Sequence, residues 1–515
     1  MKRLVVDIET DSLDATTIYC IVAKDLDEQR IYTYKPDYIQ HAKELIESAD
    51  IIVMHNGVSF DAPVLKRLLG VDIPLSKIRD TLIMSQMADP MRDGGHSLEA
   101  WGKTFGYPKL EFSDFSGYSD KMLTYCVRDV ELTAKVYNAL VPTMKGFSAR
   151  SIKLEHQIRA VIDKQEQNGF TLDVMNAMLL VAKLSDESAK INNQLQEVFK
   201  PITQIRISEK TGKRLKDNVI VFNPGSRQQI AERLSALGWK PHAYTEKGQA
   251  IVSEEVLSKV TDIPQAQLIA QYLLLEKRVS QIKSWIEAAD ENDKVHGRVL
   301  TLRTITGRMA HTSPNMAQVP AVYSPYGKEC RALWTVSSDD YVLLGTDASG
   351  LELRMLAHYM NDEAYTKEVV EGDVHTANQK AAGLPTRDNA KTFIYAFLYG
   401  AGAGKIGQVV NGTATDGQRL INNFLNNMPA LKTLAGAIVC KEWLKFIIIE
   451  ATKAQLDFKL VASVHDEYQF EVRKGQEEAF GAVTKKAMKL TEQSLNVNCP
   501  LDCEYKVGSN WADTH

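Results

Sequence analysis

One stretch constrains the fold of this chain more than any other, because it joins a strand to a helix through an acid. Residues 341–345, YVLLG, are apolar and β-prone, so they predict a buried strand. Asp347 follows this strand, and from Gly350 onward the apolar residues recur at helical spacing. A carboxylate at the end of a core strand can bind a divalent cation. The alternative is that Asp347 only caps the helix, and the stretch alone leaves both interpretations open.

The second feature is a predicted hairpin at residues 458–472, FKLVASVHDEYQFEV. Two alternating runs flank a tight corner formed by His465, Asp466 and Glu467. Adjacent acids at such a corner repel each other, and a cation would remove that penalty. Two carboxylate clusters on separate strands can hold two metal ions about 4 Å apart. A solvated hairpin tip is the alternative for an isolated hairpin.

The third feature is a predicted helix at residues 387–400, RDNAKTFIYAFLYG. Arg387, Lys391, Tyr395 and Tyr399 recur every four residues and therefore share one slowly drifting face. Two cations followed by two aromatic rings suit a triphosphate with its sugar and base beyond it. The alternative is a solvated cationic face with two partly buried tyrosines.

The three segments DASGLELR, RDNAKTFIYAFLYG and VHDEY, in this order, resemble motifs A, B and C of the family A (pol I type) DNA polymerases. The resemblance is greatest to the replicative enzymes of short-tailed bacteriophages. It implies that Asp347 and Asp466 are the catalytic metal ligands, with Glu467 beside them. The resemblance also assigns residues to the incoming nucleotide: Arg387 and Lys391 for the triphosphate, Tyr395 for the sugar, Tyr399 near the templating position, Glu352 as the gate against a 2′-hydroxyl, His375 for a phosphate, and His465.

The N-terminal part contains a second group of acids. Alternation on a short strand places Asp7 and Glu9 on the same side, and Tyr125 and Asp129 lie one helical turn apart. Together with Asp61, these acids can build another two-metal site, this time for hydrolysis. Each acid alone is explained as well by a helix cap or an exposed helix face. Jointly they resemble the DEDDy-type 3′–5′ proofreading exonuclease on an RNase H-like fold, in which Tyr125 would orient the attacking water.

The predicted fold is α/β, in three parts. We expect an exonuclease domain at residues 1–145, a helical thumb at 146–294, and a palm at 295–515 whose antiparallel sheet carries helical fingers at about 362–434. Residues 206–218 hold five basic residues. They are either a solvated loop or a thumb tip that contacts phosphates. The thumb leaves no room for the insertion that recruits thioredoxin in some phage relatives, so a thioredoxin-type factor is not expected.

Two short segments precede motif A, and the resemblance assigns Arg308 and Gln318 in them to the primer–template duplex. After motif B the chain departs from the family, because the join at Leu434–Ala435 looks shortened. The missing part normally contacts the primer–template. We therefore expect either weak binding of the duplex, with the balance shifted toward the exonuclease, or a compact variant in which the basic segment 206–218 supplies the missing contacts.

Composition sets broader limits. The formal net charge is −4, from 65 acids and 61 bases, which does not by itself indicate nucleic-acid binding, although local patches matter more than the sum. Six scattered cysteines do not form a zinc pattern and are expected to be free thiols in a reducing cytoplasm. No signal-like run or 18-residue apolar stretch occurs, so a cytoplasmic protein without membrane association is expected.

These features predict a DNA-directed DNA polymerase with proofreading that uses two Mg²⁺ ions at each site. Its expected partners are primer–template DNA and deoxynucleoside triphosphates, and replisome proteins such as a helicase–primase are compatible with it. The first alternative is a DNA-binding 3′–5′ exonuclease whose polymerase activity is impaired by the short join. The second is a non-catalytic DNA-binding protein, which the acids present at both sites argue against.

Overall fold

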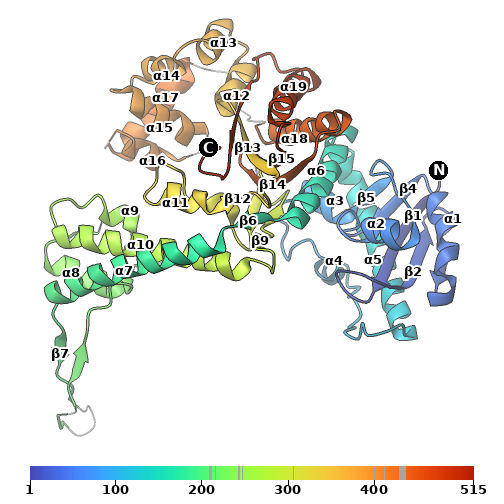
Figure 1. Cartoon of the computed structure of the whole chain (residues 1–515), viewed down its shortest axis with the longest axis horizontal. Coiled ribbons are helices and arrows are strands. Elements are labelled where there is room, and N and C mark those ends of the chain that lie inside the picture. The colour runs from blue at the N-terminus through green and yellow to red at the C-terminus, as the bar shows by residue number, and fades with distance from the viewer. Residues whose placement is uncertain are drawn as a thin grey trace.

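The computed structural model divides the chain into an N-terminal lobe and a larger C-terminal lobe (Figure 1). The structure describes residues 1–207, 212–214, 216–241, 244–245, 247–304, 307–398, 401–410, 412–427 and 436–515, and of residues 381, 398, 425–427 and 436–437 it describes the backbone alone. Two predictions therefore lie outside the described residues: the role of Tyr399 and the join at Leu434–Ala435.

The N-terminal lobe is built on a five-stranded sheet of order β3-β2-β1-β4-β5. Its central strand β1 (Arg3–Thr10) pairs antiparallel with β2 (Ile18–Asp25) and parallel with β4 (Ile51–Met54). Helix α5 (Asp120–Met144) packs on β1 and β2. The other elements of this lobe are β3 (Ile31–Tyr34), η1 (Pro36–His41), α1 (Ala42–Glu47), α2 (Asp61–Val64), η2 (Leu65–Leu69), β5 (Ile78–Asp80), α3 (Thr81–Ala88) and α4 (Leu98–Thr104).

Both faces of β1 are buried, and this fixes where its acids lie. Leu4, Val6 and Ile8 belong to one core cluster, whereas Val5 packs into a second cluster with residues of α5. Because side chains alternate along a strand, the odd-numbered acids of β1 lie on the face that α5 covers. The strand thus brings its acids to the helix that carries the rest of the predicted site.

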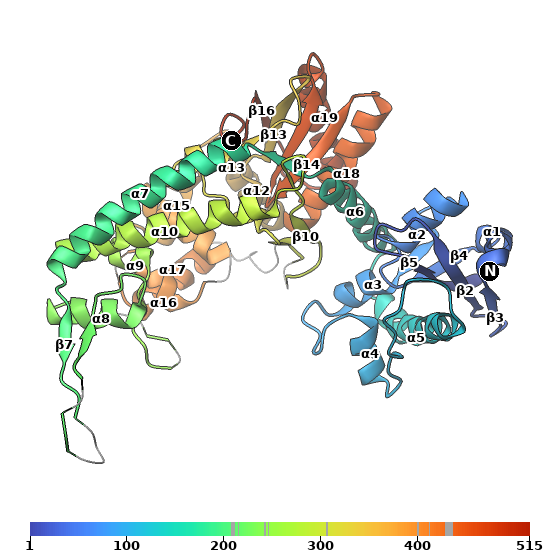
Figure 2. The ribbon, with the colours of Figure 1, turned by 60° about the horizontal axis from the view of Figure 1, so that its bottom comes forward.

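Helix α6 (Ala149–Asn168) joins the two lobes and contacts both (Figure 2). On one side, His156 Nε2 accepts a hydrogen bond from the Asp80 backbone N–H at 2.9 Å. On the other, Glu155 forms a buried ion pair of 2.8 Å with Lys441 of α18 (Gly436–Lys453). These contacts hold the two lobes together.

Two long helices, α7 (Val174–Val198) and α10 (Pro264–Ala288), pack side by side along their length. The hairpin of β7 (Ile202–Gln204) and β8 (Asn218–Ile220) extends beyond their end (Figure 1). The described part of the basic segment 206–218 adjoins these strands, with an antiparallel bridge between Ile207 and Arg214. Smaller elements complete the region and its link to the palm: β6 (Phe170–Leu172), α8 (Arg227–Ala236), α9 (Glu254–Leu257), β9 (Lys294–Val295), β10 (Arg298–Leu300), β11 (Ala310–Thr312), η3 (Met316–Gln318), α11 (Gly327–Ala332) and β12 (Trp334–Thr335).

The palm is a four-stranded antiparallel sheet of order β14-β15-β13-β16. Strand β13 (Tyr341–Ala348) lies between β15 (Glu467–Arg473) and β16 (Cys503–Gly508), and β14 (Phe458–Val464) forms the edge. Helices α18 and α19 (Glu477–Leu495) share an apolar core with these strands. The predicted buried strand and hairpin are therefore neighbours in one sheet.

A group of helices follows the palm strand β13. Helix α15 (Arg387–Leu398) confirms the predicted helix, and its residues Phe393 and Ile394 are fully buried in a separate apolar cluster with Phe424. The other helices of this group are α12 (Leu351–Met360), α13 (Glu363–Val370), α14 (Val374–Ala382), α16 (Ala403–Gln408) and α17 (Ala414–Asn427). Most of these helices lie within residues 362–434, the range expected for the fingers, and the apolar cluster also includes Leu353 and Leu356 of α12.

Candidate active sites

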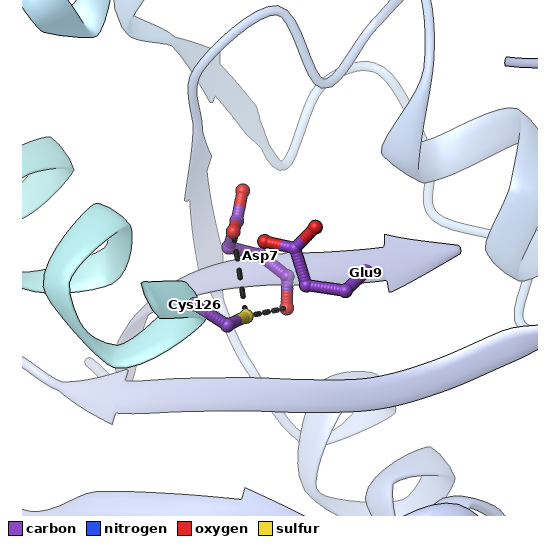
Figure 3. A group of neighbouring side chains, drawn as sticks. All are labelled: Asp7, Glu9 and Cys126. Carbon is purple, nitrogen blue, oxygen red and sulfur yellow. Dashed lines mark hydrogen bonds between the residues drawn. The ribbon is translucent and has the colours of Figure 1, made fainter. Parts of the chain in front are cut away.

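The acids predicted in the N-terminal lobe meet at the face of β1 that α5 covers. Asp7 and Glu9 lie on β1, Asp61 begins α2, and Asp129 lies on α5. The Cys126 thiol of α5 donates to Asp7 Oδ2 at 3.4 Å. One ligand atom from each of Asp7, Glu9 and Cys126 falls within 4.8 Å of the others (Figure 3). All four predicted acids line the same cleft.

Burial disfavours the ionised form of the acids in this cluster when no cation is bound. Burial and the nearby Asp61 carboxylate raise the pKa of Asp7 well above its usual value. Burial also raises the pKa of Glu9 to about 8 and that of Asp61 to about 7. Oδ1 of Asp61 and Oδ1 of Asp129 are buried without a hydrogen-bond partner among the described residues. A divalent cation would satisfy these oxygens and relieve the repulsion, so the donor set fits a metal ion that prefers oxygen ligands.

The remaining predicted residue, Tyr125, lies one turn before Asp129 on α5, with its ring centre 5.4 Å from that of Phe112. It lines a cleft of about 1710 Å³ together with the acids. Lys109 also lines this cleft, and its Nζ lies 2.6 Å from Asp129 Oδ2. Sequence reasoning missed Lys109, because it stands in a loop without a pattern that points to chemistry.

The palm site is formed where β13 ends beside the β14–β15 corner. The Ala348 backbone N–H donates to the Asp466 carbonyl at 3.1 Å, which ties the two acid-bearing segments together. A φ of 56° at His465 makes the corner tight. Partial burial and the Asp466 carboxylate raise the pKa of Asp347 to about 8, while burial and Glu352 raise that of Asp466 to about 6. These mutually repelling carboxylates also fit a divalent cation.

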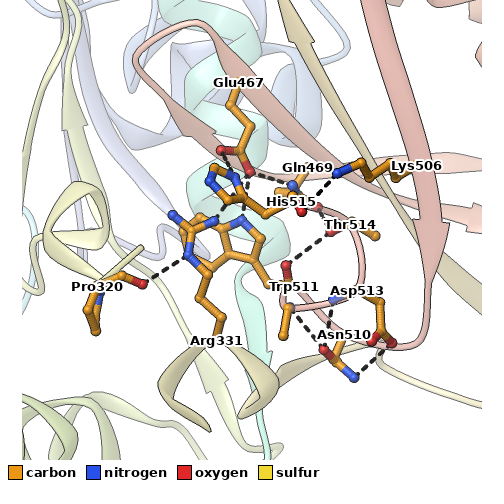
Figure 4. Close-up of polar contacts among 11 residues, drawn as sticks. Pro320, Arg331, Glu467, Gln469, Lys506, Asn510, Trp511, Asp513, Thr514 and His515 are labelled. Atoms are coloured by element: carbon orange, nitrogen blue, oxygen red, sulfur yellow. Dashed lines mark hydrogen bonds and ion pairs between the residues drawn. The ribbon is translucent and has the colours of Figure 1, made fainter. Parts of the chain in front are cut away.

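Glu467 differs from its neighbours because its carboxylate already has partners (Figure 4). Its oxygens accept hydrogen bonds from Trp511 Nε1 at 2.7 Å, Gln469 Nε2 at 2.6 Å and His515 Nδ1 at 2.9 Å. Burial alone would raise its pKa, but the bonds from His515 and Trp511 outweigh burial and lower it. The residue is thus anchored in the palm although it pairs with Asp347 across the strands.

Glu352 of α12 lies close to the palm acids. It accepts a hydrogen bond from Arg308 Nη2 at 2.8 Å, and both residues line a small cavity of about 30 Å³ with His465 and Asp466. The structure therefore brings together residues from three segments that lie far apart in the sequence. Gln318 is exposed on η3, where its carbonyl accepts from the side chain of Gln281 of α10 at 3.1 Å.

The predicted nucleotide residues lie on two adjacent helices. Arg387 of α15 pairs with Asp373, the residue that caps α14, at 2.7 Å. His375 of α14 has its ring centre 6.2 Å from that of Tyr395. Burial and the carboxylates of Glu352, Asp466 and Asp347 raise the pKa of Tyr395. Lys391 is exposed on the same helix.

Comparisons with known proteins agree with this geometry. The sequence profile of DNA polymerase family A matches residues 181–442 and 435–513, and a 3′–5′ exonuclease profile matches residues 1–145. The DNA-directed DNA polymerase of Escherichia phage T7 is 30% identical over 99% of this chain and 100% of its own length. The corresponding protein of Enterobacteria phage T3 is 29% identical over the same shares.

The alignments with these relatives also show a difference in length. They span 703 and 705 positions, whereas this chain has 515 residues, so the relatives contain segments without a counterpart here. Among solved structures, the polymerase domain of Pol1 from M. smegmatis in complex with a DNA primer–template and dNTP has the same fold. Its TM-score is 0.78 at 15% identity, over 99% of this chain and 95% of that one.

No helix in the described part of the chain is long and apolar enough to cross a membrane, and all six cysteines are buried and free. The order of the motifs, the two acidic sites and the profile matches lead to one assignment. This chain belongs to DNA polymerase family A and joins a DNA-directed DNA polymerase to an N-terminal 3′–5′ exonuclease domain.

Proposed function

We propose that the palm site extends a DNA primer along a template, using deoxynucleoside triphosphates and two Mg²⁺ ions. Polymerase and exonuclease domains of these families use divalent metals generally. Magnesium fits here because the donors that lack other partners are carboxylate oxygens. The observation that carries the proposal is that Asp347 and Asp466 meet at the ends of adjacent strands. The pKa of each carboxyl group is raised there, and a bound cation would stabilise both carboxylates in their charged form.

The palm acids hold the cations, which supply charge neutralisation for the attacking 3′-oxygen and the departing pyrophosphate. Asp347 and Asp466 are the ligands in this proposal. Glu467 acts mainly by stiffening the corner, because its oxygens already accept three hydrogen bonds. A rigid corner keeps the two ligands in the geometry that in-line attack requires.

The helices α14 and α15 orient the nucleotide. Arg387 and Lys391 bind the triphosphate, and His375 donates to one of its phosphates. The hydroxyl of Tyr395 lies near the sugar, consistent with the palm carboxylates raising its pKa. The stacking role of Tyr399 is proposed from the sequence alone.

Three more residues complete the polymerase site. Glu352, held by Arg308, excludes a 2′-hydroxyl from the sugar, and His465 borders the same small cavity. Arg308 and Gln318 lie toward the primer–template duplex. The basic segment 206–218 at the end of the thumb hairpin binds phosphates without reading sequence.

The second activity is hydrolysis of a mispaired primer end in the N-terminal lobe. Asp7, Glu9, Asp61 and Asp129 hold two Mg²⁺ ions, and Tyr125 orients the attacking water. The unpartnered buried oxygens of two of these acids support this role. We place this domain at residues 1–145, the thumb at 146–294, and the palm with its fingers at 295–515.

Helix α6, at the start of the proposed thumb, also supports the palm, because it packs against β14 and α18.

A primer-extension assay on a labelled primer–template tests the proposal. With nucleotides and Mg²⁺ the primer should lengthen, and without nucleotides it should shorten from its 3′ end. EDTA should stop both reactions. The assay is repeated over a range of primer–template and salt concentrations. Degradation without extension under all of these conditions would contradict the polymerase proposal. It would favour a 3′–5′ exonuclease whose polymerase activity is impaired by the short join at Leu434–Ala435.

A further inference from the structure

Lys109 lies inside the acidic cluster of the exonuclease domain. Among the ion pairs of the described residues, it makes the one that involves any of the four acids, with Nζ 2.6 Å from Asp129 Oδ2. Its Nζ lies 4.8 Å from the ring centre of Tyr125. The Lys109 side chain is 24% exposed, against 6% for that of Asp129. The ammonium thus stands between buried acids and the open cleft.

The loop before Lys109 is fixed to the helix that carries the site. Arg128 Nη1 of α5 donates to the Pro108 carbonyl at 3.0 Å, and its guanidinium lies 3.9 Å from the ring centre of Tyr107. The Tyr107 hydroxyl in turn donates to Glu131 of α5. Because α5 also carries Tyr125 and Asp129, the ammonium has a set position relative to both. Groups fixed in this way lose little energy to rearrangement when charge develops nearby.

Hydrolysis places a phosphodiester beside four carboxylates, so repulsion must be offset where the phosphate binds. Water adds to the phosphorus and the bond to the 3′-oxygen of the preceding nucleotide breaks. One proton leaves the attacking water and one reaches that oxygen, while Lys109 keeps its protons. A lysine ammonium has three donors. Asp129 takes one of them, so the ammonium can still donate to a phosphate oxygen in the cleft.

We propose that Lys109 is a further catalytic residue of the exonuclease, whose ammonium binds a non-bridging oxygen of the phosphodiester being cleaved while holding Asp129 and Tyr125 in place. This inference rests on the proposed exonuclease function. It adds a fixed positive charge of the protein to the charge that the divalent ions supply.

The test compares Lys109→Met, which keeps the aliphatic stem, with Lys109→Arg in the full chain. At saturating Mg²⁺, Lys109→Met should lower kcat for degradation of a single strand by about 100- to 1000-fold, the usual cost of losing one such donor. KM should change by no more than about threefold, and primer extension should persist. Lys109→Arg keeps the positive charge, so its kcat for degradation should be at least about tenfold higher than that of Lys109→Met. The matched control Lys121→Met removes an exposed cation of the same cleft, and its effect should stay within about threefold.

A second readout does not depend on turnover. In EDTA, Lys109→Met should bind a short single strand about fivefold more weakly than the parent, because the phosphate then meets the carboxylates without the ammonium. Degradation by Lys109→Met within threefold of the parent would overturn the inference. So would full recovery at excess Mg²⁺, which would make Lys109 only an aid to cation binding. Should Lys109→Met fail to fold in its N-terminal lobe, a loss beyond 100-fold in a folded Lys109→Arg would count against it. A parent chain that degrades no DNA would instead refute the exonuclease proposal itself.

Discussion

The two acidic sites of this chain reach a similar chemistry by different constructions. In the N-terminal lobe, β1, α2 and α5 bring four acids and Lys109 together within one domain. In the palm, Asp347 lies on β13 and Asp466 in the neighbouring β14–β15 turn, but the expected nucleotide residues stand on α14 and α15, which have their own apolar core. Hydrolysis needs only the 3′ end of a DNA strand to reach acids that one lobe carries. Synthesis must admit a new nucleotide at each step, which suits a site divided between two cores.

The sites also differ in how their acids are satisfied. Two buried oxygens of the exonuclease acids have no hydrogen-bond partner among the described residues. In the palm, the Glu467 carboxylate accepts hydrogen bonds from Trp511, Gln469 and His515 (Figure 4). We therefore propose that cations bind at the unsatisfied buried acids and that Glu467 supports the palm instead.

The largest effect is expected from Asp466→Ala. It should reduce primer extension by at least about 1000-fold, because it removes a cation ligand from the reacting centre. Binding of primer–template, measured by fluorescence anisotropy, should change little, since Asp466 makes no phosphate contact in the proposal. Extension at near the parent rate would show that the hairpin corner is not the catalytic centre.

A smaller effect, on the order of 100-fold in selectivity, is expected from Tyr395→Phe. The Tyr395 hydroxyl can replace the 3′-hydroxyl that a dideoxynucleotide lacks, so the parent chain should accept dideoxynucleotides almost as readily as natural ones. The phenylalanine variant should reject them. Competition between the two nucleotide types in single-turnover extension measures this ratio, and strong rejection by the parent would contradict the assignment of Tyr395.

Glu467→Gln should lower extension by about tenfold or less, much less than Asp466→Ala. Glutamine can still accept from Trp511 and can pair with the other tautomer of His515, so the corner should remain in place. The comparison of kcat for the two variants at saturating Mg²⁺ tests the division into ligand and support. A loss for Glu467→Gln equal to that for Asp466→Ala would make Glu467 a ligand as well.

The smallest effect is a shift in stability with pH. Folding raises the pKa of Glu9 to about 8 and that of Asp61 to about 7, so between pH 5 and 8 the folded state binds more protons than the unfolded state. Stability in EDTA should therefore fall as pH rises through this window, with the melting temperature of the N-terminal lobe dropping by about 3–8 °C. Mg²⁺ should offset the drop, and Asp7→Ala with Glu9→Ala should flatten it. A melting temperature that rises with pH would contradict the raised pKa values.

The sequence predicted the parts of this molecule that rest on periodicity and on order of motifs. The helix at Arg387, the strand before Asp347 and the hairpin around Asp466 were predicted from spacing alone and are confirmed as elements. The α/β fold and the polymerase and exonuclease family followed from the order of the motifs and are confirmed by the comparisons.

What the sequence could not supply are contacts between distant segments. The ion pair of Lys109 with Asp129 depends on how a loop returns to α5, and the bonds to Glu467 depend on where Trp511 and His515 pack. Neither involves a periodic pattern, because each arises from tertiary packing. For the same reason, the proposed division of the acids into ligands and supports rests on contacts that the sequence does not show.

We expect synthesis and degradation to use two independent acidic sites, and one assay measures both activities at once. Extension and degradation of the same labelled primer are measured for the parent chain, for Asp7→Ala with Glu9→Ala, and for Asp466→Ala. The account predicts that the N-terminal double variant loses degradation and keeps extension, while Asp466→Ala loses extension and keeps degradation. Equal loss of both activities in either variant would contradict it.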